Sequence, residues 1–414
     1  MSDPTRSAAL DLLAAVLDRR RTLEHALDSL PPLEARDRAA AHRLAAGTLR
    51  RLGTLDALLE PLLRRAPPAG VRHILRLGAA GLLLLGTPSH AAISTAVDLA
   101  RARGFAPFAG LVNAVLRRLA AEGQERLAEL DGPRLDTPAW LWASWGAQAR
   151  AIAEAHGREA PLDLTLRPGA APPEGGEALP TGSWRYAPGT RVTELAGYAE
   201  GGFWVQDAAA ALPAVLLGVR AGERVADLCA APGGKAAQLA AAGARLWAVE
   251  RDPERLARLR ENFSRLRLAA EFVAADAAAW HPEETFDAVL LDAPCSATGT
   301  IRRHPDLPHL RRPRDLAPLA LAQDRLLEAA AALLAPGGRF VYAVCSLQPE
   351  EGEERVAAAL ARPGLVREPI LPSEVPGLEV ALTPSGDLFT TPALWPERGG
   401  LDGFYVARLR RPPS

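Results

Sequence analysis

The first third of the chain carries hydrophobic residues at helical spacing. Leucine, valine and alanine recur three or four positions apart between residues 6 and 130, a period typical of amphipathic helices. Proline and glycine interrupt this pattern at Pro31-Pro32, Pro67-Pro68, Thr87-Pro88 and Gly104 to Pro107, where helices are expected to end. The pattern predicts an all-α bundle of about six or seven helices, forming a first domain over residues 1–130.

The pattern changes after residue 130. Tryptophans are frequent, at Trp140, Trp142, Trp145 and Trp184, and proline and glycine punctuate residues 168–189. Leu162 to Leu166 alternates between apolar and polar residues, as a half-buried strand does. We predict a small α+β linker domain over residues 131–203.

From residue 204 to residue 414, short apolar runs alternate with helical segments. The predicted strands are Arg224 to Cys229, Leu246 to Glu250, Ala270 to Ala274, Asp287 to Leu291 and Arg339 to Val344. The predicted helices are Lys235 to Ala242, Pro253 to Leu266 and Leu316 to Leu334. This alternation predicts an α/β domain with a mostly parallel sheet and right-handed crossovers. The fold class is therefore multidomain: an all-α bundle, a small α+β linker and a Rossmann-like α/β domain.

Composition and charge narrow the functional classes. Hydrophobic residues make up 48% and charged residues 23% of the chain, which is typical of a globular protein. No apolar run reaches the ~18 residues of a membrane-spanning helix, and residues 1–11 lack a secretion signal. We therefore expect a cytoplasmic protein without membrane contact. Residues 1–120 hold 17 arginines against 10 acidic residues, which suggests a polyanionic partner.

Lys235 is the only lysine in the chain, so this position is expected to need a compact ammonium group. It ends the glycine-rich loop Cys229-Ala230-Ala231-Pro232-Gly233-Gly234-Lys235, which joins the first predicted strand to a helix. Such a loop lies where α/β sheets bind ligands. Glu250, about 20 residues downstream, is placed to bind ribose hydroxyls, and Asp276 to meet an adenine. The alternative is a simple tight turn; the spacing does not fit a dinucleotide-binding G-x-G-x-x-G motif.

Two of the three cysteines follow predicted strands. Cys295 comes after Asp292-Ala293-Pro294, and Cys345 comes directly after Val344. Because the fourth strand is expected between the first and the fifth, Asp292, Cys295 and Cys345 should gather at one carboxyl edge of the sheet. The alternative is that the cysteines fill small spaces in the core, as most free cysteines do. For Cys229, inside the loop, this packing role is the preferred interpretation.

These motifs resemble the signature blocks of the Sun/NOL1/NOP2 family of RNA 5-methylcytosine methyltransferases. The resemblance rests on Asp227 to Lys235, on Asp292 to Gly299 and on Cys345-Ser346. It implies that S-adenosylmethionine binds residues 229–235, Glu250, Asp276 and Asp292. Glu250 departs slightly from the family, in which aspartate is usual at this position. The resemblance further implies that Cys345 attacks the base and that Cys295 assists release.

The proposed chemistry needs these residue types. Carbon 5 of cytosine is a poor nucleophile, and addition of a thiolate to carbon 6 turns the base into an enamine that can attack a methyl donor. Hydrogen bonding at N3 eases the addition, and a carboxyl group such as that of Asp292 suits this role.

The front of the chain sharpens the resemblance. Residues 37–52 and Gly110 to Arg118 resemble a NusB-like RNA-binding domain. The combination implies small-subunit (16S) ribosomal RNA, or an early assembly intermediate, as the substrate of a monomer that uses no metal. Arg302, Arg303 and His304 are candidate RNA contacts, or a solvated charged loop.

Two other functions remain open, methylation of transfer RNA and a non-catalytic role in ribosome assembly. A DNA cytosine methyltransferase would carry its nucleophile in the Pro-Cys motif, would need no second cysteine, and would have a variable DNA-recognition region. The sequence does not fit that pattern. A small-molecule methyltransferase would not need the long N-terminal part.

Overall fold

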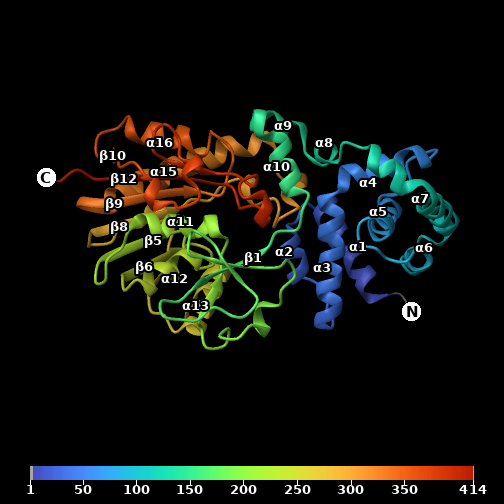
Figure 1. Cartoon of the computed structure of the whole chain (residues 1–414), viewed down its shortest axis with the longest axis horizontal. Coiled ribbons are helices and arrows are strands. Elements are labelled where there is room, and N and C mark those ends of the chain that lie inside the picture. Colours follow the sequence, from blue (N-terminus) through green and yellow to red (C-terminus); the bar gives the residue numbers. More distant parts are fainter. Residues whose placement is uncertain (1–2, 414) are drawn as a thin grey trace. The chain divides into compact units, whose positions relative to one another are not determined.

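The computed structural model describes residues 3–413. The described chain forms two compact units (Figure 1). The first contains the residues up to Arg158 together with Ile301–Arg312, and the second contains Glu159–Thr300 and the residues from Pro313 onward. The sequence-based boundaries after residues 130 and 203 stay a prediction. No helix of the described chain is long and apolar enough to cross a bilayer.

The first unit begins with the predicted all-α bundle. Its helices are α1 (Pro4–Leu17), α2 (Leu23–Asp28), α3 (Ala35–Arg50), α4 (Leu52–Leu59), α5 (Ala69–Leu83), α6 (Ser89–Ala102) and α7 (Ala109–Glu129). Helix α1 starts where it does because the Asp3 side chain caps the backbone N–H of Arg6 and Pro4 occupies the first turn. The apolar faces of the helices form one shared core. The predicted proline and glycine breaks fall between these helices.

Three short helices complete the N-terminal part of this unit: α8 (Gly132–Asp136), α9 (Ala139–Trp145) and α10 (Ala149–His156). The segment Ile301–Arg312, which contains α14 (Leu307–Leu310), packs on the same unit. The Asp306 carboxylate accepts a hydrogen bond from the backbone N–H of Leu23 at 3.0 Å. The Arg50 guanidinium donates to the Arg302 carbonyl at 2.9 Å. This segment therefore belongs to the helical unit, although its neighbours in sequence belong to the second unit.

The second unit opens with a four-stranded antiparallel sheet in the order β2-β3-β1-β4. Its strands are β1 (Leu162–Leu166), β2 (Glu177–Ala178), β3 (Trp184–Tyr186) and β4 (Phe203–Val205). The strand predicted at residues 162–166 is confirmed. Leu164, Tyr186 and Phe203 form its small core.

Replacing Asp163 by asparagine is expected to destabilise the second unit by about 3–5 kcal/mol. The fully buried Asp163 carboxylate receives hydrogen bonds from the Arg185 guanidinium at 2.7 and 2.6 Å, and another from the backbone N–H of Ala208. The substitution leaves the arginine charge buried without a counter-charge. Urea-induced unfolding followed by circular dichroism measures the loss. Glu194→Gln is the control, because Glu194 pairs with Arg191 at the surface, where an ion pair contributes less than about 1 kcal/mol. Equal losses in both variants would contradict the prediction.

The larger sheet has the strand order β10-β12-β9-β8-β5-β6-β7, with β11 beside β12. Its strands are β5 (Arg224–Leu228), β6 (Arg245–Glu250), β7 (Glu271–Ala274), β8 (Phe286–Asp292), β9 (Leu334–Val344), β10 (Val366–Arg367), β11 (Leu388–Thr390) and β12 (Phe404–Arg410). Strands β5 to β9 are parallel, whereas β12 runs antiparallel to β9. The predicted parallel sheet is confirmed, and the antiparallel strands after residue 360 were not predicted.

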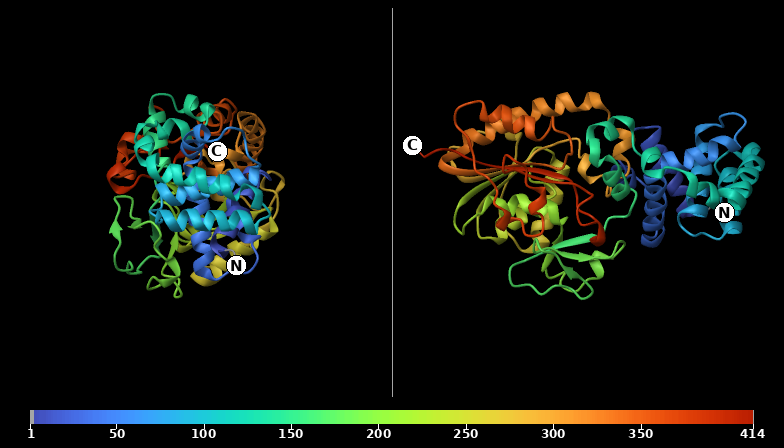
Figure 2. Two further views of the ribbon diagram at one scale, coloured as in Figure 1. Left: turned by 90° about the vertical axis from the view of Figure 1, so that its right-hand side faces the viewer. Right: turned by 45° about the horizontal axis from the view of Figure 1, so that its top comes forward.

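Helices cover both faces of this sheet (Figure 2). One face carries α11 (Ala208–Leu217), α12 (Gly234–Ala241) and α13 (Pro253–Leu266); the other carries α15 (Leu316–Leu333) and α16 (Glu353–Leu360). Each face has its own apolar core, because alternate residues of the strands point to opposite sides. This layering leaves the carboxyl ends of β5 to β9 as the edge from which the connecting loops emerge.

Candidate active site

Two cysteines lie at the carboxyl ends of neighbouring parallel strands. Cys295 follows β8 and Cys345 directly follows β9, and Asp292 of β8 is in register with Ala343 of β9. The two sulfur atoms are 3.4 Å apart, and both cysteines are free thiols. The predicted strand order thus brings together two cysteines that are separated by 50 residues.

The two thiols differ in their surroundings. Hydrogen bonding to Cys345 raises the pKa of Cys295 well above its usual range, and burial adds to the rise. The negative charge of Glu351 acts in the same direction. Cys295 therefore keeps its proton at neutral pH and can donate it to the Cys345 sulfur. A thiol that donates a hydrogen bond stabilises a thiolate on its partner, which is the form that acts as a nucleophile.

A buried carboxylate holds the two cysteine loops together. Glu351 is fully buried. One oxygen accepts from the backbone N–H of Ser296 at 2.8 Å and from the Gln323 amide at 3.2 Å. The other accepts from the hydroxyl of Ser346 at 2.6 Å and from the hydroxyl of Ser296. Because Ser296 follows Cys295 and Ser346 follows Cys345, one side chain fixes the separation of both loops.

The loop after β5 has a backbone that suits close approach of a ligand. Cys229 and Gly233 have positive φ angles of 65° and 111°. A side chain at position 233 would place its Cβ 2.5 Å from Leu259, so only glycine fits there. The loop is braced from α13 by Asn262, which donates to the Pro232 carbonyl at 2.9 Å. Helix α12 then begins at Gly234, and its first N–H groups face the loop.

Lys235 and Asp292 form an ion pair at the same edge of the sheet. The ammonium nitrogen lies 2.7 Å from Asp292 Oδ2 and 5.1 Å from the centre of the Phe404 ring. Burial lowers the pKa of Lys235, but the charges of Asp292 and Cys345 outweigh it and raise that pKa above its usual value. The lysine therefore stays cationic and interacts favourably with an anionic sulfur at Cys345.

Three acidic residues follow neighbouring strands of the sheet. Asp227 lies near the end of β5, Glu250 ends β6 and Asp276 follows β7. Burial raises the pKa of Asp227 well above its usual range, and neither of its carboxylate oxygens has a hydrogen-bond partner among the described residues. Glu250 is buried, and it accepts from the backbone N–H of Asp252 at 3.0 Å. Asp276 is exposed and caps the turn that follows it.

Cys229 differs from the other two cysteines. Burial, with the nearby charge of Glu250, raises its pKa to about 12. Its side chain packs against the core on the α15 face of the sheet. These surroundings keep the thiol protonated and support a packing role.

Three residues of this site were given no role from the sequence: Asp227, Phe404 and Glu351. Asp227 carries a signal, since it is an acidic residue near the end of an apolar strand. Phe404 and Glu351 carry none, because both come from segments whose position depends on tertiary packing. Of the two interpretations of Arg302, the solvated loop is wrong, because its side chain is only 1% exposed. His304 is exposed.

A five-residue loop, residues 229–233, joins β5 to α12, and acidic residues stand at the end of β6 and just after β7. In doubly wound sheets, this carboxyl edge is where ligands bind. With the NusB-like bundle, the fold defines a two-part methyltransferase. Residues 214–410 match the family model described as 16S rRNA methyltransferase RsmB/F, and residues 3–121 match the NusB family. The chain belongs to the RsmB/F family of methyltransferases.

Individual relatives are similar in sequence over almost the whole length of this chain. Ribosomal RNA small subunit methyltransferase B of Pseudomonas putida is 39% identical, over 98% of this chain and 98% of its own. The protein of the same name from Erwinia tasmaniensis is 35% identical over the same shares. The crystal structure of PH0851 covers 99% of this chain and 100% of its own, with a TM-score of 0.76 and 23% identity. That last similarity shows the fold alone.

Proposed function

We propose that the chain transfers a methyl group from S-adenosylmethionine to carbon 5 of a cytosine in small-subunit (16S) ribosomal RNA. The observation that carries this proposal is the pair of free thiols, 3.4 Å apart, beside an ion-paired carboxylate at the carboxyl edge of the sheet. Full-length similarity to small-subunit ribosomal RNA methyltransferases supports the substrate.

The residues present fit S-adenosylmethionine. Asp227 supplies buried carboxylate oxygens without a partner in the described chain, as the cationic amino group of the cofactor requires. Residues 229–235 offer backbone close to the ligand, Glu250 a carboxylate for the ribose hydroxyls, and Asp276 a contact for the adenine. Asp292 would contact the cofactor from the side on which the substrate base binds. When bound, the cofactor supplies an electrophilic methyl group on a sulfonium.

Each side chain then has a defined task. The Cys345 thiolate adds to carbon 6 of the cytosine, and the electron pair of the C5–C6 double bond moves toward carbon 5 and the ring. Asp292 accepts a hydrogen bond from a protonated N3, which favours the addition. After methylation a water molecule takes the proton from carbon 5, its electron pair re-forms the C5–C6 double bond, and the Cys345–C6 bond breaks, with Cys345 leaving as the thiolate and N3 giving up its extra proton. Cys295 assists this release by donating a hydrogen bond to the departing Cys345 sulfur, 3.4 Å away.

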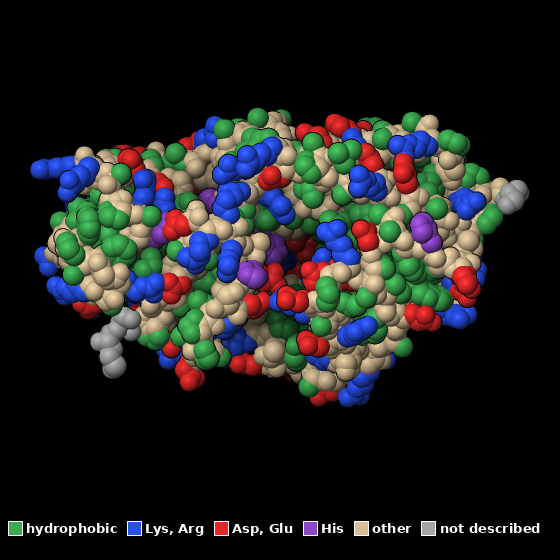
Figure 3. Space-filling view, turned by 180° about the vertical axis from the view of Figure 1, so that it is seen from behind, with side chains coloured by type: hydrophobic (Ala, Val, Ile, Leu, Met, Phe, Trp, Pro, Cys, Tyr) green, Lys and Arg blue, Asp and Glu red, His purple; other side chains and the backbone are tan. Residues whose placement is uncertain are grey.

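The helical unit supports an RNA substrate. A groove of about 690 Å³ on its surface is lined by apolar residues, including Phe108 and Leu111, and by Arg64, Arg65 and Arg118. At the left-hand end of Figure 3, which is the first unit, basic side chains (blue) surround a hydrophobic area (green). Arginines beside aromatic surface favour a single-stranded or looped nucleic acid.

Glu250→Ala is expected to weaken binding of S-adenosylmethionine about 10- to 100-fold. One hydrogen bond from a ribose hydroxyl to a charged group contributes about 1.5–3 kcal/mol, and the expected loss corresponds to one such bond. Isothermal titration calorimetry with the purified chain measures the dissociation constant. Glu271→Ala, an exposed glutamate at the start of β7, is the matched control and should change it less than about twofold. Unchanged affinity in Glu250→Ala would remove Glu250 from the cofactor site.

The function itself is tested with labelled S-adenosylmethionine and three substrates: unmodified 16S ribosomal RNA, assembled small subunits and transfer RNA. The expected product is 5-methylcytidine in ribosomal RNA, identified by nuclease digestion and chromatography. Label in transfer RNA alone would keep the chemistry and overturn the substrate. Label at another atom of the base would overturn the cysteine mechanism. Binding of RNA without transfer of label would favour a non-catalytic assembly factor.

A further inference from the structure

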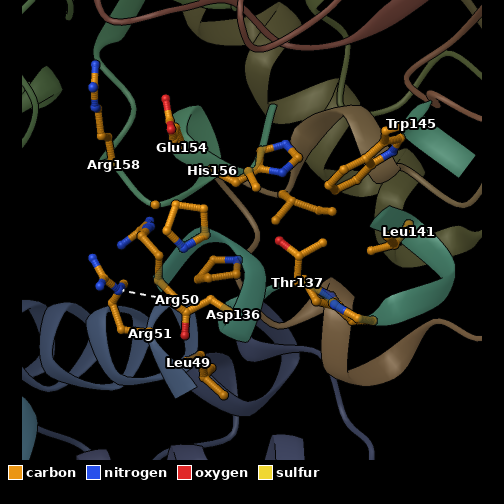
Figure 4. Close-up of a pocket in the computed structure, with 17 residues that line it drawn as sticks. Leu49, Arg50, Arg51, Asp136, Thr137, Leu141, Trp145, Glu154, His156 and Arg158 are labelled. Atoms are coloured by element: carbon orange, nitrogen blue, oxygen red, sulfur yellow. Dashed lines mark ion pairs between the residues drawn. The ribbon is translucent and has the colours of Figure 1, made fainter. Parts of the chain in front are cut away.

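The helical unit contains a cavity that the methyltransferase reaction does not use. It has a volume of about 230 Å³ and is lined entirely by residues of the first unit. Its walls come from the junction of α3 and α4, from α8 to α10, and from Ile301, Pro305 and Pro308 (Figure 4). This volume suits one small planar group with part of its attached chain, and not a helix or a duplex.

Buried polar atoms in the wall lack partners. Trp145 and His156 are 7% and 6% exposed, and their rings meet edge to face with centroids 5.2 Å apart. The indole nitrogen of Trp145 and Nε2 of His156 have no hydrogen-bond partner among the described residues. Burial and the charges of Arg302 and Arg50 lower the pKa of His156 to about 3, so its ring is neutral at pH 7. An unpartnered buried polar atom costs about 1–3 kcal/mol, which a ligand with hydrogen-bonding edges would recover.

Basic groups stand at one side of the same cavity. Arg50, Arg51 and Arg158 line it (Figure 4). Arg51 is neutralised by Asp136, with Nε 2.8 Å from Oδ2. The exposed guanidinium of Arg158 has no ion-pair partner in the described part of the chain. Glu154 is exposed at the rim and is the only other acidic residue of the lining. The side of the cavity with the arginines therefore suits an anion.

We propose that this cavity binds one unstacked nucleotide of the RNA substrate, with its phosphate toward Arg158 and the edge of its base toward Trp145 and His156. The indole N–H only donates, so the base must present a carbonyl or ring-nitrogen acceptor. Unstacked bases held by aromatic and imidazole side chains, with arginines on the backbone, are the usual mode of single-stranded RNA recognition. The inference rests on the proposed function, because it takes the ligand from the RNA that is methylated.

The wall of the cavity is connected to the active site through the chain. Ile301, Pro305 and Pro308 follow Thr300, which ends the loop that starts at Cys295. In the first unit this segment is fixed by His309, whose Nε2 lies 2.9 Å from the Leu49 carbonyl. A nucleotide in the cavity would therefore contact the segment that continues the Cys295 loop. It would thereby restrict which nucleotides of a bound RNA can be methylated.

The test is crosslinking and kinetics with the full-length chain. A single-stranded fragment of 16S ribosomal RNA carrying 4-thiouridine is irradiated on the protein, and the crosslinked peptides are mapped by mass spectrometry. Crosslinks are expected in residues 139–158 or 301–308. Arg158→Ala and Trp145→Phe should each raise KM for ribosomal RNA about 5- to 20-fold, the loss expected for one hydrogen bond to a charged or buried group. Their kcat and their affinity for S-adenosylmethionine should stay within about twofold of wild type.

Arg101→Ala is the matched control, since Arg101 is an exposed arginine on α6 of the same unit and does not line the cavity. If the wild type methylates ribosomal RNA while both cavity variants keep its KM and no crosslink falls in the cavity, the inference is overturned and the proposed function stands. Binding of free 5′-ribonucleoside monophosphates as tight as that of the RNA fragment would assign the cavity to a free nucleotide and overturn the RNA source. A wild type that methylates no RNA contradicts the proposed function itself.

Discussion

Replacing Cys345 by alanine is expected to lower kcat for methyl transfer by on the order of 10⁴-fold or more. Loss of a covalent nucleophile removes the whole low-barrier route, and the remaining binding groups cannot activate carbon 5 on their own. Affinity for S-adenosylmethionine should change less than about twofold, because the substitution leaves the cofactor loop at residues 229–235 intact. Methyl transfer from labelled cofactor to 16S ribosomal RNA measures the effect.

Cys295→Ala should give a different result. With the release step impaired, the chain is expected to accumulate a protein–RNA adduct that survives denaturation and carries the methyl label. Its kcat for turnover should fall, while a single round of transfer remains. The 3.4 Å separation of the two sulfur atoms supports this division, since the pKa of Cys295 is raised and it can act as a proton donor beside the nucleophile. Electrophoresis under denaturing conditions, with and without nuclease, detects the adduct.

Cys229→Ala is the matched control for both variants. Cys229 is the third cysteine, it lies in the cofactor loop and its pKa is raised to about 12, so it should form no adduct. Methyl transfer by Cys345→Ala together with loss of transfer in Cys295→Ala would reverse the two roles. Wild-type activity in all three variants would exclude covalent catalysis by a cysteine.

The large sheet and the position of the cysteines could be predicted from the sequence because both follow from local signals. Apolar runs of strand length separated by helices define β5 to β9, and parallel strands have their carboxyl ends at one edge. Cys295 and Cys345 come after two of those strands, so their proximity needs no knowledge of packing. The cofactor loop is similarly local, since Gly233 is required by its φ of 111° and by the contact with Leu259.

The features that escaped prediction depend on contacts between distant segments. Ile301–Arg312 reads as part of the α/β domain, yet Asp306 and His309 bind backbone atoms of Leu23 and Leu49 in the helical unit. A charged side chain such as Arg302 is expected at the surface from its residue type, whereas its burial follows from this packing. The cavity around Trp145 and His156 is likewise defined by three separate segments, which no local pattern reveals.

Glu351→Gln is expected to lower kcat about 10- to 100-fold with little change in the affinity for S-adenosylmethionine. The Glu351 carboxylate accepts hydrogen bonds from Ser296, Ser346 and Gln323, so both of its oxygens must act as acceptors. A glutamine amide presents one acceptor and one donor, so two charge-assisted bonds become neutral or are lost. Each such bond contributes about 1.5–3 kcal/mol. The effect should fall on kcat, because the hydrogen bonds of the Glu351 side chain go to the two cysteine loops and to α15, and they set the separation of those loops.

Comparing the change in kcat with the change in unfolding temperature decides whether Glu351 positions the cysteines or only supports the fold. Glu353→Gln is the control, since Glu353 lies two residues away in the first turn of α16 and is exposed. If Glu351 is a positioning residue, Glu351→Gln should also alter the ratio of adduct to free product, because the relative placement of Cys345 and Cys295 controls both bond formation and release. A variant with a lower unfolding temperature but wild-type kcat and adduct level would assign Glu351 a structural role only. Loss of kcat without loss of stability, by contrast, would assign Glu351 a positioning role. Burying its carboxylate between Ser296 and Ser346 costs desolvation free energy. The precise placement of two reactive sulfur atoms would explain why that cost is accepted.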